Sequence, residues 1–156
     1  DRVRRSLDLL RRLRDYLRGH GHGCDDSARQ AARDVLRYFD IAAPLHHEDE
    51  ELHVFPPLLA QEHDAPLVTL VRQLQRDHVR MAERWATARG PLQAMADGQL
   101  PAFSAEHEAA LDGFAECYAD HLRHEDDSIY PAARALLDLG AQSAMGQEMA
   151  RRRGVR

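Results

Sequence analysis

Residues 65–89 read APLVTLVRQLQRDHVRMAERWATAR, and this stretch decides the fold class of the chain. Its apolar side chains recur at steps of three and four residues, which is the spacing of one face of an α-helix. The positions on this face are Leu67, Val71, Leu74, His78, Met81, Trp85 and Ala88. The stretch therefore predicts a long core helix that carries one imidazole, that of His78, among its apolar side chains.

Three further segments show the same periodicity, over roughly residues 1–18, 27–53 and 102–129. Asp25 or Asp26 is placed to cap the second helix, and Asp64 to cap the third. Pro44 lies inside the second segment and should kink or split it, whereas Pro56-Pro57 and Gly90-Pro91 should end the second and third helices. No stretch alternates apolar and polar residues as a strand would.

These segments predict an all-α fold, an antiparallel up-down four-helix bundle. The bundle should cover residues 1–131, and residues 132–156 should form a short C-terminal helical extension. A chain of 156 residues suits one such domain. Its net charge of -5 argues against nucleic acid as a partner, and its apolar runs are too short to span a membrane. Cys24 and Cys117 fit a reducing compartment, so we expect a cytoplasmic protein.

Five polar residues occupy positions that the helical period assigns to the core. They are His46, Glu50, His78, His121 and Glu125. A single histidine on an apolar face is usually a hydrogen-bonded core residue. A buried carboxylate is different, because it costs several kcal/mol unless it finds a partner. Two His and Glu pairs spaced i, i+4 place both donor groups on one helix face, so this set predicts a metal site.

The chain also contains an internal repeat with an offset of 75 residues. His46, Glu50, Glu51, Val54, Phe55 and Pro56 match His121, Glu125, Asp126, Ile129, Tyr130 and Pro131. The turns expected near residue 62 and near residues 99–100 set His78 opposite both His46 and His121. A duplicated helix hairpin of this kind is a natural scaffold for two metal ions bridged by carboxylates.

These motifs resemble the hemerythrin-like family, the HHE cation-binding domain. The first motif runs from His46 to Pro56, the isolated histidine is His78, and the last motif runs from His121 to Pro131. The resemblance implies a non-haem di-iron site and work with oxygen or related molecules. It implies metal ligation by the five polar residues named above, with Glu50 and Glu125 as candidate bridges.

The chain departs from the oxygen-carrying members in two places. Ala82 stands where they have a second third-helix histidine, and residues 1–18 lack the expected first-helix histidine. We expect that ligand to precede Asp1, because stepping back three or four residues from Val3 along the apolar face, or reflecting the level of His46 through the first turn, leads to a position just before Asp1. The family's carriers would use Asp126 as the last carboxylate, whereas helix geometry favours Glu125. The role of His47 stays open: it could be a ligand, or it could lie behind the ligands.

With fewer histidines than a carrier, the chain fits sensing or binding of O2, NO or peroxide better than reversible O2 transport. The alternative is storage or buffering of iron or another divalent metal without dioxygen chemistry. An enzymatic role stays open and is the weaker interpretation.

Two helical turns from the site, Phe39, Trp85 and Phe114 should form an apolar layer.

Overall fold

The structure is a computed structural model that describes residues 1–19, 23–137 and 139–154. These residues are largely helical and contain no β-strand, which confirms the all-α fold class. The chain divides into two compact units, which we describe separately. The first unit comprises Asp1–Pro44 and Arg80–Tyr118, and the second comprises Leu45–Val79 and Ala119–Arg156. Within the described ranges, no helix is both long and apolar enough to cross a membrane.

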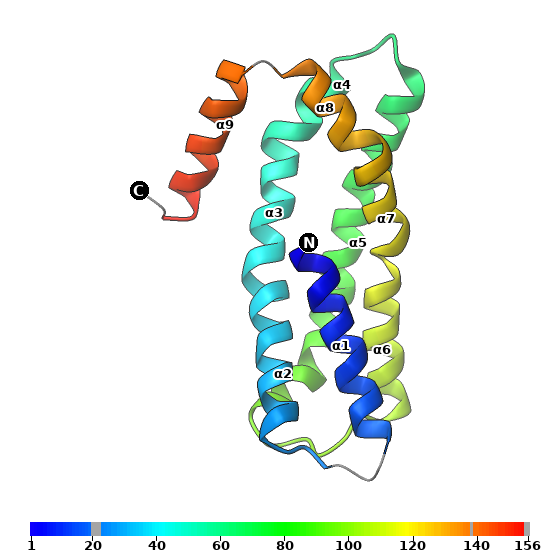
Figure 1. The fold of residues 1–156 in the computed structure, drawn as a ribbon. Coiled ribbons are helices and arrows are strands. Elements are labelled where there is room, and N and C mark those ends of the chain that lie inside the picture. Colours follow the sequence, from blue (N-terminus) through cyan, green and yellow to red (C-terminus); the bar gives the residue numbers. More distant parts are fainter. Residues whose placement is uncertain (20–22, 138, 155–156) are drawn as a thin grey trace. The chain divides into compact units, whose positions relative to one another are not determined.

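The first unit is built from four helical segments. They are α1 (Arg2–Arg18), α2 (Asp26–Arg37) with the π-helical segment η1 (Tyr38–Ala42), the C-terminal part of α5 (Ala65–Ala96), and α6 (Ala105–Glu116). Helix α1 runs beside α2 and α6 (Figure 1). Arg18 Nε donates to Glu108 Oε1 at 2.8 Å, and Arg14 pairs with Asp112, so ion pairs join α1 to α6.

The helices begin where the sequence places capping residues. The backbone N–H of Ala28 donates to the Asp25 side chain at 2.9 Å, and that of Leu67 donates to Asp64 at 3.1 Å. Helix α6 begins with a reciprocal pair, in which Ser104 Oγ accepts from the His107 N–H and His107 Nδ1 accepts from the Ser104 N–H. Each cap satisfies donors that the first helical turn leaves without partners.

The three aromatic residues predicted to form a layer pack together in the first unit. The Phe39 ring centroid lies 4.9 Å from that of Phe114 and 5.3 Å from that of Trp85. Trp85 Nε1 also donates to Asp40 Oδ1 at 2.8 Å, and Asp40 forms an ion pair with Arg89. The cluster is the apolar centre of this unit, with one satisfied polar edge.

Helix α5 does not end at Gly90-Pro91 as the sequence predicted, but continues through Pro91 to Ala96. Leu92 and Met95 are both fully buried in this last stretch. Burying two large apolar side chains is worth several kcal/mol, which exceeds the cost of about 3 kcal/mol for an interior proline. Packing therefore outweighs the local helix-breaking signal.

The second unit contains most of α3 (Ala43–Asp49) and the N-terminal part of α5. It also contains η2 (Glu50–Val54), α4 (Phe55–Leu59), α7 (Ala119–His124), η3 (Glu125–Ile129), α8 (Tyr130–Leu136) and α9 (Leu139–Arg152). Its apolar core joins α5 to both copies of the repeat. The core residues are Val54, Phe55, Leu58, Val71, Leu74, Ile129 and Ala133.

The prolines of the repeat do not end their helices, although the sequence predicted that Pro56-Pro57 would end the second helix. Pro56 and Pro131 stand in the first turns of α4 and α8, where the missing backbone N–H costs little. Pro44 likewise does not break the second helix, because the π-helical segment η1 leads directly into α3. The backbone N–H of Ala43 bonds to the Tyr38 carbonyl, five residues back, which widens the helix just before the proline.

Candidate metal centre

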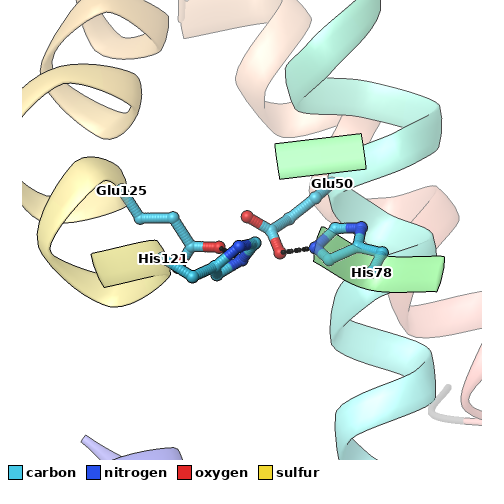
Figure 2. Close-up of side chains that lie close together, drawn as sticks. All are labelled: Glu50, His78, His121 and Glu125. Atoms are coloured by element: carbon cyan, nitrogen blue, oxygen red, sulfur yellow. Dashed lines mark ion pairs between the residues drawn. The ribbon is translucent and has the colours of Figure 1, made fainter. Parts of the chain in front are cut away.

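Four side chains from separate segments of the second unit converge on one point. Glu50 comes from η2, His78 from α5, His121 from α7 and Glu125 from η3 (Figure 2). Each offers one nitrogen or oxygen atom, and these four atoms lie within 4.8 Å of one another. The residues are 1%, 8%, 2% and 2% exposed. The structure thus brings together four of the five residues that the sequence predicted as metal ligands.

Both carboxylate ligands stand at the start of a π-helical segment. The segment η2 begins at Glu50 and η3 begins at Glu125, 75 residues apart, as in the sequence repeat. In each segment the closing backbone N–H reaches back five residues, from Phe55 to Glu50 and from Tyr130 to Glu125. Single π turns inside α-helices are often found at functional sites. Here they place each glutamate at a widened turn of its helix.

Each histidine of the group has a carboxylate behind it. His121 Nδ1–H donates to Asp77 Oδ2 at 3.0 Å, and His78 Nδ1–H donates to Glu51 Oε1 at 2.8 Å. A carboxylate in this position fixes the imidazole tautomer and orients the ring. Because Nδ1 carries a proton, Nε2 of each ring keeps its lone pair whenever that ring is in its neutral form. Both lone pairs are directed toward the interior of the group.

The donor atoms that face one another lack hydrogen-bond partners. His121 Nε2 lies 2.6 Å from Glu125 Oε1, and His78 Nε2 lies 3.3 Å from Glu50 Oε1. Within the described part of the chain, none of these four buried atoms has a hydrogen bond of acceptable geometry. Two lone pairs facing two carboxylate oxygens repel unless a positive charge lies between them. The donor set therefore fits a bound cation.

The two glutamates differ in their electrostatic environment. Burial and the nearby Glu125 raise the pKa of Glu50 strongly. The pKa of Glu125 is lowered instead, because its contacts with His121 and Glu50 outweigh the effect of burial. The pKa of His121 is raised despite burial, through Glu125 and Asp77. A proton thus takes the place of a cation in this group when no metal is bound.

Tyr130 adds a hydroxyl group at the edge of the site. Its phenol lies 3.0 Å from Glu125 Oε2 and 3.3 Å from Glu50 Oε2, and His46 Nε2 lies 3.2 Å from it. The Oε2 atoms of both glutamates are therefore occupied, while their Oε1 atoms face the histidines. Burial and the two carboxylates raise the pKa of Tyr130, so the phenol stays protonated. The repeat places Phe55 at the matching position without a hydroxyl.

His46, the fifth predicted ligand, lies beside the group of four and outside it. Its Nε2 is 3.6 Å from Glu50 Oε1, but its side chain is 46% exposed, whereas that of the matching His121 is 1% exposed. Its role as a ligand stays a prediction. His47, which the sequence left open, stacks on His78 with centroids 4.1 Å apart. Burial and His78 lower the pKa of His47 to about 3, so its ring is neutral.

The alternative carboxylate, Asp126, is exposed and lies outside the group that contains Glu125. Glu51 contacts α5 through His78 and through Gln75 Nε2, which donates to its Oε2 at 3.2 Å. The structure therefore places Glu125 among the donors and Glu51 behind one of them.

A family model described as the hemerythrin HHE cation binding domain matches residues 1–133. The chain belongs to this family. The match confirms the resemblance drawn from the motifs, and the buried His and Glu group lies within it. A protein of Haemophilus influenzae, described only as an uncharacterized protein, is 30% identical over 156 residues. That alignment covers 99% of this chain and 86% of the relative.

Sequence reasoning missed the residues that orient the ligands of this hemerythrin-like site. Asp77 was visible only as the neighbour of a predicted ligand, and Tyr130 only as an aromatic residue of the repeat. Their roles depend on contacts between helices, which a helical period does not report. The π-helical segments were also not predicted, because a search for a period of 3.6 residues does not distinguish them from an α-helix.

Proposed function

We propose that this hemerythrin-like chain is a non-haem iron protein that holds a di-iron site and binds or senses O2, NO or peroxide. One observation carries the proposal. Two imidazole nitrogens and two carboxylate oxygens meet in a buried place, and none of these four atoms has a hydrogen-bond partner among the described residues.

The chemistry of the donors supports iron. Imidazole suits iron, copper, nickel and zinc, and carboxylate suits harder cations, so a mixed set without thiolate fits iron in both common oxidation states. Cys117 and Cys24 are free and stand outside the group. Glu51 and Asp77 add negative charge behind the histidines, which favours a site of high positive charge.

The repeat supports a pair of ions. Glu50 and Glu125 occupy matching positions and are the candidate bridges, and His78 and His121 are the candidate terminal ligands. His46 is placed to complete the set, because its ring lies within 3.6 Å of a glutamate oxygen. Bound iron would supply reversible electron transfer and a position for a small diatomic ligand.

Neighbouring side chains orient the four candidate ligands. Asp77 and Glu51 hold the two histidine rings, and Tyr130 holds the Oε2 atoms of the two glutamates. Burial of the four ligands excludes bulk water. A site of this kind favours a small, weakly polar molecule over a large substrate.

Metal loading tests the proposal. The purified protein is stripped with a chelator, loaded with Fe(II) without oxygen and desalted, and its iron content is measured. We expect a pair of iron ions per chain and a near-ultraviolet band that changes on exposure to O2 or NO. Glu125→Gln should lose the iron. Glu62→Gln is the matched control, because Glu62 is an exposed glutamate of the same unit.

Three results would contradict parts of the proposal. Absence of bound iron would refute metal binding of this kind. Iron that binds but shows no spectral response to O2, NO or peroxide would favour storage or buffering. Equal iron content in Glu125→Gln and Glu62→Gln would place the metal elsewhere.

A further inference from the structure

The C-terminal helix α9 contacts the segment that carries Glu50, and these contacts are ionic. Both oxygens of Asp49 pair with arginines of the C-terminal segment, Oδ1 with Arg152 and Oδ2 with Arg153. Arg152 also lies 3.1 Å from Glu48 Oε2. On the other side of the ligand, His53 pairs with Glu148 of α9. Contacts at residues 48, 49 and 53 therefore bracket Glu50.

Asp49 is the centre of this arrangement. It is 5% exposed, directly precedes Glu50 in the chain, and is the N-cap residue of η2. A buried carboxylate requires a charged partner, and two guanidinium groups supply it. The pairing fixes the backbone at the residue before the ligand. A π-helical turn has poorer intrinsic stability than an α-helical turn, so η2 depends on such tertiary contacts.

The sequence repeat gives an independent indication that these contacts are specific. The positions that match Glu48, Asp49 and His53 in the second copy hold Arg123, His124 and Ser128. The second copy therefore lacks the acidic pair, although it has the same metal ligand and the same π-helical segment. The acidic pair occurs only in the copy that α9 contacts.

We infer that α9 is a clamp, and that Arg152 and Arg153 are positioning residues that hold Glu50 at the metal centre through Asp49. Their loss frees the segment 48–54 and so speeds the release of metal. The metal-release part of this inference rests on the proposed function, whereas the clamping of the segment does not.

The test compares two variants of the full-length protein with the parent. Arg152→Gln/Arg153→Gln removes both guanidinium groups, and Arg151→Gln is the matched control, because Arg151 is an exposed residue of the same helix. In the metal-free proteins, hydrogen exchange at the amides of residues 48–54 should be faster in the double variant only. In proteins loaded with Co(II) as a spectroscopic probe, transfer of the metal to a chelator should be faster by roughly tenfold or more, the usual effect of losing groups that support ligands.

A third variant protects the test against a general loss of folding. Asp49→Asn removes the other side of the pairing, and its effect should not add to that of the double arginine variant, because both remove one interaction. Unchanged exchange in the double variant would overturn the clamp. Faster exchange with unchanged Co(II) release would overturn the positioning role. If no protein bound Co(II), the proposed function would fail while the exchange result still decided the clamp.

Discussion

Replacing Glu50 with Gln should stabilise the metal-free protein while it abolishes metal binding. Glu50 is 1% exposed, and burial beside Glu125 raises its pKa strongly. At neutral pH the folded metal-free protein must therefore keep a proton on this residue, whereas the unfolded chain releases it. Glutamine has nearly the same shape and carries no such requirement.

The magnitude follows from proton linkage. Below a pH of about 4.3, the usual pKa of glutamate, both states bind the proton and the residue carries no penalty. As the pH rises above that value, only the folded state retains the proton, so its stability falls by about 1.4 kcal/mol per pH unit. Between pH 4.3 and pH 7 the penalty reaches about 3.7 kcal/mol, which is the ceiling for the gain from Glu50→Gln.

Urea denaturation of both proteins in the presence of a chelator, at several pH values, measures this difference. Glu50→Gln should be the more stable protein at pH 7, and its advantage should shrink as the pH falls toward 4.3. Glu62→Gln should stay within about 0.5 kcal/mol of the parent, as exposed substitutions usually do. An advantage that is absent at pH 7, or that grows toward acid, would refute the reasoning. Without chelator, added Fe(II) should stabilise the parent and leave Glu50→Gln unchanged.

Three further outcomes are expected. Asp77→Asn should weaken metal binding by about 10- to 100-fold in a chelator competition, because the His121 ring loses its carboxylate partner, while the helical content stays unchanged. Asp40→Asn should lower the free energy of unfolding by about 0.5 to 1 kcal/mol at pH 7, because Arg89 lowers the pKa of Asp40 in the folded protein. This difference should disappear as the pH falls through that lowered pKa, because both proteins are then neutral at residue 40. Leu74→Ala should cost about 3 to 5 kcal/mol in urea denaturation, because Leu74 is fully buried in the core of the second unit.

The sequence was sufficient for the fold class and for most of the donor group. Helical periodicity predicted that His78, His121 and Glu125 would be buried, because a period of 3.6 residues reports directly which face a residue occupies. It also predicted burial of Glu50, and the repeat gave the matching glutamate. The family resemblance rested on the same residues and is confirmed.

Local signals failed where tertiary contacts compete with them. Pro56 and Pro91 are helix breakers by propensity, yet one stands in the first turn of α4 and the other inside α5. His46 lies on the same predicted helix face as Glu50, but its side chain is half exposed. The acidic residues Asp49 and Asp77 gave no signal, because their partners lie 103 and 44 residues away in the chain.

The paired π-helical segments also carry information about descent. Each holds one residue more than an α-helix of the same height, and η2 and η3 stand at the same offset in the two copies. The shared offset makes an insertion that preceded the duplication the simplest history, with both copies inheriting the widened turn. Leu52 and Asp127 occupy matching exposed positions in these turns. Deletion of either residue would remove the widened turn from one copy alone.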